Sequence, residues 1–242
     1  MAEASFIARG GSSKVAVVTG AAGGIGGAIA GALGACGWRV AGIDLVGSVR
    51  ECELSLVADV TDAAAVSGAV ARVKAVLGVP RLLVTAAGHY AMCPVSEIDG
   101  AAWDRMLAVH LGGTANACRA VIGPMVAAGG GRIVTVSSEL GLAGGDGDAH
   151  YAAAKGAIIG FTRSLAAELA PFGILVNSVA PGPTDTPLLD PDSPWRAPEY
   201  LATLPSRRLV APAEVAEVVA FLADEGTNFV GQVVSPNAGA VI

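Results

Sequence analysis

The sequence predicts an α/β fold with one doubly wound parallel sheet and helices on both of its faces. Short, β-branched apolar runs alternate with segments of helical periodicity along most of the chain. The first of these runs is followed at once by a glycine-rich turn and then by a helical segment. This order favours parallel pairing and right-handed crossovers, which place a ligand beyond the carboxyl ends of the strands.

In the first half of the chain the first expected strand is a continuous apolar, β-branched run, as burial on both faces requires. The segments between them have apolar residues at helical spacing, and Thr61 or Asp62 can cap the second helix. The expected strands are 15–19, 39–44, 56–59 and 82–87. The apolar helix positions are Ile25, Ile29 and Leu33, then Val66, Val70, Val73 and Leu77.

The second half repeats the same order. We expect a long helix over 101–128, a strand over 132–138, a helix over 151–169 and a strand over 174–180. Segment 181–205, with seven prolines and two aromatic residues, Trp195 and Tyr200, then breaks the rhythm, and we interpret 183–205 as a substrate lid. Residues 1–13 are polar and aperiodic and are expected to form a disordered arm, with 14–242 as a single domain.

Composition disfavours several classes of protein. The net charge is -6 and the sequence contains no cluster of lysines or arginines, which argues against nucleic acid as a partner. No apolar stretch is long enough for a membrane span, and the N-terminus lacks the pattern of a secretory signal. The four cysteines are widely spaced and no histidines lie at zinc-ligand spacing, so we expect no metal and a cytoplasmic location with reduced thiols.

The glycine-rich turn, residues 19–26, is the first candidate site. Gly20, Gly24 and Gly26 permit a tight turn and let main-chain N–H groups approach a pyrophosphate at the helix N-terminus, beside Ile25. The spacing differs from the Gly-x-Gly-x-x-Gly of two-domain dehydrogenases, and no Lys-Ser/Thr pair follows, which excludes a nucleoside-triphosphate loop. The turn therefore indicates a dinucleotide.

Carboxylates follow the next two strands. Asp44 can accept hydrogen bonds from both hydroxyls of an adenosine ribose, and its charge disfavours a 2′-phosphate, so NAD is preferred over NADP. Arg39 and Arg50 keep NADP as an alternative. Asp59, followed by Val60, could meet the adenine edge or simply cap the helix that follows.

Tyr151 and Lys155 are spaced to lie on one face of a helix. Lowering the pKa of a tyrosine by about three units requires about 4 kcal/mol of phenolate stabilisation. We expect the Lys155 ammonium and a nicotinamide cation to supply it. Ser138, at the end of its strand, can hold a substrate oxygen in line with Tyr151, with Ser137 as the reserve candidate.

Together these residues make the chain resemble the short-chain dehydrogenase/reductase family, from about residue 14 to the C-terminus. Overall it is similar to 3-oxoacyl-carrier-protein reductases and to bacterial alcohol and hydroxyacyl dehydrogenases. The resemblance implies a Rossmann-type fold, a homotetramer and a lysine that also binds the nicotinamide ribose. It implies contacts to the cofactor from Ala87, Gly88, Pro181, Gly182 and Thr186. The motifs are Thr19-Gly20, Gly24-Ile25-Gly26, Asp59-Val60, Ala86-Ala87-Gly88, Ser138, Tyr151 with Lys155, Asn177 and Pro181-Gly182.

The chain departs from the family pattern in the long helix, where His110 stands in place of an asparagine that anchors a water beside the lysine. His110 could bind that water and serve the proton relay, or it could be an interior histidine without a catalytic role. His89 and His150 could reach the substrate cleft or lie in surface loops. Thr85 and the C-terminal segment 235–239 also differ from the family pattern.

The function expected from these observations is NAD-dependent hydride transfer between the nicotinamide and a secondary alcohol or ketone, with Tyr151 as general acid/base. Two alternatives remain open: a non-catalytic NAD(P)-binding regulator, which His110 would suit, and an NADP-dependent 3-oxoacyl reductase. A nucleotide-sugar epimerase is disfavoured, because the chain after Pro205 is too short for the larger substrate domain of such enzymes.

Overall fold

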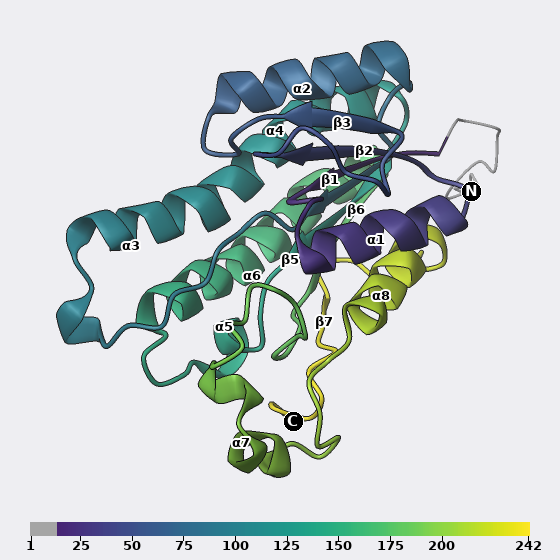
Figure 1. Ribbon diagram of the computed structural model, residues 1–242. Helices are drawn as coiled ribbons and strands as arrows, with labels where there is room; N and C mark the ends of the chain where they lie inside the picture. Colours follow the sequence, from purple (N-terminus) through teal and green to yellow (C-terminus); the bar gives the residue numbers. More distant parts are fainter. Residues whose placement is uncertain (1–13) are drawn as a thin grey trace.

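The computed structural model describes residues 14–242, and its strands form one seven-stranded sheet in which every neighbouring pair is parallel (Figure 1). The strand order is β3-β2-β1-β4-β5-β6-β7. This confirms the predicted fold class, while the arm predicted at 1–13 lies outside the described residues. The strands are β1 Val15–Thr19, β2 Arg39–Asp44, β3 Leu54–Val57, β4 Leu82–Thr85, β5 Gly131–Val136, β6 Ile174–Val179 and β7 Val233–Val234.

Helices cover both faces of the sheet (Figure 1). Helices α1 (Gly24–Ala35) and α8 (Pro212–Asp224) lie side by side on one face. Helices α2 (Ala63–Val76), α4 (Gly113–Ala127) and α6 (Ala149–Leu169) cover the other. Shorter elements are η1 Val95–Glu97, α3 Gly100–Leu107, η2 Ala108–Gly112, α5 Leu140–Ala143, η3 Ala170–Phe172, η4 Pro194–Arg196 and α7 Pro198–Thr203.

Alternating side chains of each strand feed two separate cores. In β1, Val15 and Val17 pack with the α2, α4 and α6 side, whereas Ala16 and Val18 pack with the α1 and α8 side. All four are fully buried. Burial of one such valine stabilises the fold by about 1.5–3 kcal/mol, so a strand that is apolar at every position suits a sheet covered on both faces.

The helix predicted over 101–128 is interrupted. It begins as α3, where the Asp99 side chain accepts a hydrogen bond from the N–H of Ala102 (2.7 Å), passes through the π-helical η2 and continues as α4. Helix α6 begins two residues before its predicted start, at Ala149. Of the two cap candidates for α2, Asp62 is the one that accepts hydrogen bonds from the first turn, from Ala64 and Ala65.

Helix α8 and strand β7 were not predicted from the sequence, and β7 is only two residues long. It pairs with Ser178 and Val179 of β6. Segment 229–232 covers more of this edge, because the N–H of Gly231 donates to the carbonyl of Val176 (2.8 Å). The Asn177 side chain donates to Phe229 and accepts from the N–H of Gln232, so Asn177 ties the segment to the sheet.

The chain between β6 and α8 lies beyond the carboxyl ends of the strands and includes the predicted lid. Its end packs against the C-terminal segment, where Gly239 faces the ring of Pro205 so closely that a Cβ would collide with it. Figure 1 places the C-terminus beside α7 accordingly. Because β1 and β4 are neighbours at the point where the strand order reverses, the crevice expected for a ligand opens here.

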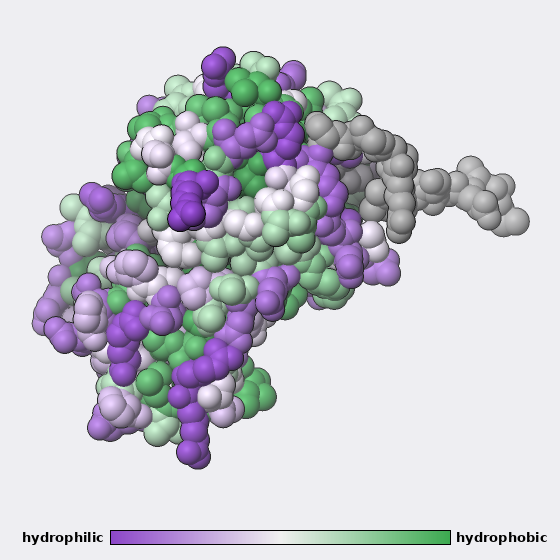
Figure 2. Space-filling model, turned by 45° about the vertical axis from the view of Figure 1, so that its right-hand side comes forward, coloured by the Kyte–Doolittle hydropathy of each residue, from purple (hydrophilic) through white to green (hydrophobic). Residues whose placement is uncertain are grey.

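Within residues 14–242 no helix combines the length and apolar character needed to cross a membrane. Hydrophilic and hydrophobic residues are interspersed on the face shown in Figure 2. All four cysteine thiols are free. The described part of the chain contains no group of acidic, histidine and cysteine side chains that could hold a metal ion.

Candidate active site

The glycine turn packs backbone against backbone, which explains its glycines. Gly20 has a φ of 69°, and a Cβ there would lie 2.6 Å from the main chain of Ala87 at the end of β4. Gly26 faces the carbonyl oxygen of Gly20 so closely that a Cβ would collide with it. Gly23 is the N-cap of α1 and provides no side-chain cap, so N–H groups of the first turn stay available. This arrangement fits a dinucleotide pyrophosphate.

Asp44 lies beside this turn, at the end of β2. Its carboxylate accepts hydrogen bonds from the N–H groups of Ala22 (2.9 Å) and Leu45 (2.7 Å), and the side chain is partly exposed. These contacts fix a negative charge next to α1, where the ribose of a dinucleotide bound along the turn would be expected.

Asp59 is exposed and does not cap α2, since Asp62 does. The capping alternative for Asp59 is therefore wrong. Its carboxylate instead accepts hydrogen bonds from the N–H and hydroxyl of Thr61, both 2.8 Å, and these lower the pKa of Asp59. Val60 is buried against Gly113 of α4, and its carbonyl accepts a hydrogen bond from Asn116 (2.9 Å).

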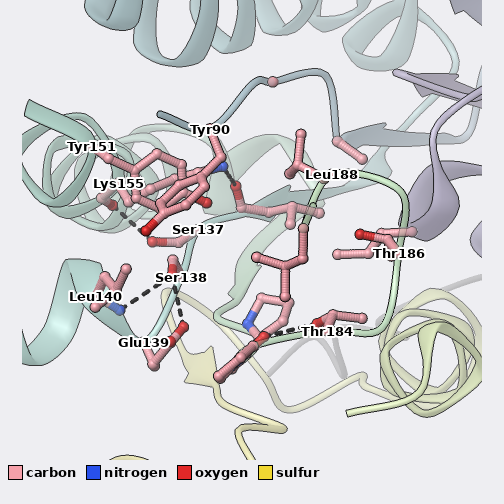
Figure 3. A pocket seen from close by; sticks show the side chains of 18 of the residues that line it. Tyr90, Ser137, Ser138, Glu139, Leu140, Tyr151, Lys155, Thr184, Thr186 and Leu188 are labelled. Carbon is pink, nitrogen blue, oxygen red and sulfur yellow. Dashed lines mark hydrogen bonds between the residues drawn. The ribbon is translucent and has the colours of Figure 1, made fainter. Parts of the chain in front are cut away.

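A cavity that is open to solvent lies beyond the ends of β4, β5 and β6 (Figure 3). Leu188, Leu189 and Trp195 of the predicted lid contribute to its wall. The predicted site residues that line it are Ile25, Gly88, His110, Ser138, Tyr151, Lys155, Pro181, Gly182 and Thr186.

The other predicted cofactor residues lie outside this cavity, along the glycine turn and the strand ends beside it. Thr186 connects the two regions, because it lines the cavity and also contacts the turn. A Cβ on Gly24 would lie 2.6 Å from the Thr186 methyl group. The residues outside the cavity lining are Gly20, Gly24, Gly26, Asp44, Asp59, Val60 and Ala87.

Tyr151 and Lys155 lie one turn apart on α6, and the Lys155 ammonium is 5.6 Å from the centre of the Tyr151 ring. Lys155 Nζ donates to the carbonyl of Val136 (3.0 Å) at the end of β5. Ser138 follows on the same chain segment and lies on the same side of the cavity (Figure 3). Ser137 donates to the carbonyl of Lys155 (2.7 Å), so its hydroxyl is already paired.

Glu139 lines the cavity next to Ser138 and was missed by the sequence analysis. Its side chain is 6% exposed, and the Ser138 hydroxyl donates to its Oε2 at 2.7 Å. Burial raises the pKa of Glu139 to about 6, the Ser138 hydrogen bond opposes the rise, and the Asp148 carboxylate adds to it. A charged residue directly after a buried strand was the available signal.

The protonation equilibria of the cavity depend on burial and on Glu139. Burial raises the pKa of Tyr151 above its ordinary value, and the Glu139 carboxylate adds to this rise. Burial lowers the pKa of Lys155 to about 8, while the charge of Glu139 opposes this fall. Near pH 7, Tyr151 therefore keeps its proton and Lys155 is mostly an ammonium. We expect Lys155 to lower the pKa of Tyr151. Its charge then has to overcome burial and the Glu139 carboxylate, which both raise this pKa.

Tyr90 connects the predicted lid to Tyr151. The Tyr90 ring stands edge-on to the Tyr151 ring, with centroids 5.1 Å apart. The Tyr90 hydroxyl donates to Asp148 (2.8 Å) and accepts a hydrogen bond from the Trp195 indole (2.9 Å). Burial raises the pKa of Asp148. Trp195 of the predicted lid is thereby hydrogen-bonded to Tyr90, whose ring contacts Tyr151.

His110 lies in η2, is 2% exposed and packs edge-on against Tyr151, with centroids 5.4 Å apart. Its Nε2 lies 2.8 Å from the carbonyl oxygen of His89, while its buried Nδ1 has no partner in the described chain. Burial lowers the pKa of His110 to about 2, so the ring is neutral at physiological pH. Neither His89 nor His150 is among the residues that line the cavity.

Glu139→Gln is expected to stabilise the protein at pH 8 and not at pH 4.5. Folding raises the pKa of Glu139 from 4.5 to about 6, so ionisation disfavours the folded state once the pH exceeds both values. The neutral amide avoids a penalty on the order of 2 kcal/mol. Thermal unfolding of both proteins at the two pH values measures the difference. An equal change in Tm at both pH values would contradict it, and Glu199→Gln, an exposed side chain, is the control.

The comparisons with known proteins agree with this arrangement. A family model described as short chain dehydrogenase matches residues 14–197. A cis-4-hydroxycyclohexanecarboxylate dehydrogenase of Sinomonas cyclohexanicum is 39% identical over 238 residues, covering 93% of this chain and 96% of the relative. The 3-oxoacyl-[acyl-carrier-protein] reductase FabG of Escherichia coli is 35% identical with the same coverage.

A D-threitol dehydrogenase of Mycolicibacterium smegmatis is 36% identical, covering 90% of this chain and 88% of the relative. Among solved structures, a protein named ribose-5-phosphate isomerase from Brucella melitensis superposes with a TM-score of 0.89 at 34% identity. The match covers 95% of this chain and 92% of that one.

Proposed function

This chain belongs to the short-chain dehydrogenase family, and from that premise we propose that it transfers hydride between NAD and a secondary alcohol or its ketone, with Tyr151 as general acid/base. The observation that carries the proposal is that Tyr151, Lys155 and Ser138 border one cavity. Ile25, from the helix that follows the glycine turn, borders the same cavity. A dinucleotide that follows the turn would thus bring its reactive ring to the phenol.

A bound nicotinamide supplies the carbon that accepts or donates hydride. The protein holds and orients the reactants. The N–H groups at the start of α1 would bind the pyrophosphate, and Asp44 would bind the adenosine ribose. Ser138 would hold the substrate oxygen next to the Tyr151 hydroxyl.

In ketone reduction Tyr151 gives its proton to the substrate oxygen, and in alcohol oxidation it takes that proton. The Lys155 ammonium stabilises the phenolate by its charge, and its hydrogen bond to the carbonyl of Val136 keeps it beneath the ring. Pro181, Gly182 and Thr186 would line the nicotinamide. Segment 183–205 would close over the substrate as a lid.

The proposal is tested by mixing the purified protein with NAD and a panel of secondary alcohols while following the absorbance of reduced nicotinamide. Turnover of at least one alcohol, or of a ketone in the reverse assay, is the expected result. Tight NAD binding without turnover across the panel would instead support a non-catalytic regulator. The same protein in light scattering is expected to behave as a homotetramer.

Asp44→Asn is expected to reduce the preference for NAD over NADP at least tenfold. The carboxylate would lie next to the 2′-phosphate of NADP, and like charges at that distance repel by more than about 1 kcal/mol at intermediate dielectric. The amide removes the charge and keeps one of the two acceptor oxygens, so it retains one of the hydrogen bonds from the Ala22 and Leu45 N–H groups. The ratio of kcat/KM for the two cofactors measures the effect.

Asp59→Asn is the matched control for Asp44→Asn. It removes one negative charge from the neighbouring strand end, where we propose a contact to the adenine, which NAD and NADP share. The cofactor ratio is therefore expected to stay within about twofold of the wild-type value. If Asp59→Asn changed the ratio as much as Asp44→Asn does, a general effect of surface charge would explain both and the assignment of Asp44 would fail.

A second candidate, NADP-dependent reduction of a 3-oxoacyl thioester, is favoured by the similarity to the Escherichia coli reductase over nearly the whole chain. Oxidation of NADPH by an acetoacetyl thioester tests it. Isomerisation of a sugar phosphate, the activity for which the Brucella melitensis protein is named, is less well supported here. Lys155 is the one lysine or arginine among the residues that line the cavity, and the Glu139 carboxylate would repel a phosphate.

A further inference from the structure

Several polar side chains of the cavity are hydrogen-bonded to other groups of the protein. The Thr184 hydroxyl donates to the carbonyl of Gly182 (2.8 Å), and the Tyr90 hydroxyl donates to Asp148. Ser137 and Lys155 donate to main-chain carbonyls. Glu139 depends on a group that the proposed reaction itself needs.

That group is the hydroxyl of Ser138. In residues 14–242 it is the one side-chain donor to the Glu139 carboxylate, and no lysine or arginine forms an ion pair with Glu139. A serine hydroxyl has a single proton to donate. When Ser138 turns that proton toward a substrate oxygen, a carboxylate that is 6% exposed loses this donor and keeps only hydrogen bonds from the main-chain N–H groups of Glu139 and Leu140.

A buried carboxylate that loses one of its hydrogen bonds is destabilised, so a replacement donor on the substrate would strengthen binding in the reacting complex. Apolar side chains form much of the surrounding wall, including those of Leu140, Leu188 and Leu189, and they carry no donor. A hydroxyl of the substrate can take the place of Ser138. Its position is set by the 2.7 Å contact between Ser138 Oγ and Glu139 Oε2. The donor to the reacting oxygen and the acceptor for a second hydroxyl are therefore one hydrogen bond apart.

We propose that Glu139 determines substrate specificity by accepting a hydrogen bond from a second substrate hydroxyl, on the carbon next to the reacting one. The two oxygens of a vicinal diol in its gauche form are separated by about the length of a hydrogen bond, which matches the spacing of Ser138 and Glu139. The substrate class is therefore vicinal diols and the matching α-hydroxy ketones. This inference rests on the proposed function, since it assigns Ser138 to the oxygen at the reacting carbon.

The test compares butane-2,3-diol with butan-2-ol, which lacks only the second hydroxyl. The wild-type protein is expected to oxidise the diol with a kcat/KM at least about tenfold higher, because a hydrogen bond to a charged group is at stake. Glu139→Met, of similar length without an acceptor oxygen, should bring the ratio of the two kcat/KM values to about one. Glu139→Gln keeps an acceptor oxygen without the charge and should give an intermediate ratio.

Thr184→Val is the matched control, since it removes another polar group from the same cavity wall. Its hydroxyl is already paired with Gly182, so the variant is expected to change both rates by a similar factor and to leave their ratio unchanged. A Glu139→Met variant that lowers both rates equally would overturn the inference, because Glu139 would then only orient Ser138. A wild-type protein that uses the two alcohols equally well would overturn it too.

A binding measurement separates this inference from the proposed function. In the presence of NAD, butane-2,3-diol is expected to raise the Tm of the wild-type protein and of Thr184→Val, but not of Glu139→Met. If no alcohol is turned over and this pattern still holds, the proposed function fails while the assignment of Glu139 stands. If the diol stabilises Glu139→Met as well as the wild type, the assignment of Glu139 fails, whatever the rates are.

Discussion

Tyr151→Phe is expected to lower kcat by about three orders of magnitude, because it removes the proton that the substrate oxygen gains in ketone reduction. The ring itself remains. It packs edge-on against Tyr90 and His110, and phenylalanine keeps both contacts. The Kd for NAD and the Tm should therefore change little. Steady-state rates, NAD titration and thermal unfolding of the two proteins measure the three quantities.

Tyr90→Phe serves as the control for Tyr151→Phe, since it removes a phenol hydroxyl from the adjoining ring. That hydroxyl bonds Asp148 and Trp195, so its loss should act on the lid more than on proton transfer. A decrease in kcat much smaller than that of Tyr151→Phe is expected. Turnover by Tyr151→Phe at the wild-type rate would disprove the assignment of Tyr151.

Gly26→Ala is expected to weaken NAD binding by more than about a hundredfold and to lower the Tm. The new methyl group would point at the carbonyl oxygen of Gly20, so either the turn or the start of α1 has to move. Overpacking of this kind costs about 1–3 kcal/mol, and displacement of the N–H groups at the helix terminus weakens the pyrophosphate contacts further. Calorimetric titration with NAD and thermal unfolding measure both effects.

Gly34→Ala tests whether these effects are specific to the turn. Gly34 lies in the same helix, is exposed, and has no atom within 4 Å of the position that a Cβ would occupy. Alanine should therefore stabilise α1 by about 0.5–1 kcal/mol and leave the affinity for NAD unchanged. If both variants weakened NAD binding alike, the close approach of Gly26 to Gly20 would not be the cause.

The parallel strands could be predicted because burial on both faces leaves a local signature, short runs dominated by apolar and β-branched residues. The two-residue β7 has no such signature and exists because residues far away in the sequence pair with it. The π-helical η2 was also missed, since apolar spacing over a single turn does not distinguish it from an α-helix.

The site was predictable to the extent that its residues are close in sequence. Tyr151 and Lys155 are one helical turn apart, so their spacing alone places them on one face. The contact of Glu139 with the cavity depends on how α5, α6 and the lid pack around it, and a single carboxylate after a strand is usually a cap. The link from Trp195 through Tyr90 to Asp148 joins three distant segments, and no spacing predicts it.

The outer edge of the sheet, where the short β7 covers only part of β6, affects the solubility of the chain during folding. Beyond the short pairing with β7, Val176 and Asn177 are held by segment 229–232 near the end of the chain. Until that segment docks, the outer row of amide and carbonyl groups is a template on which a second copy could add a strand. Protection against self-association is therefore completed late, by residues that leave the ribosome after the rest of the sheet.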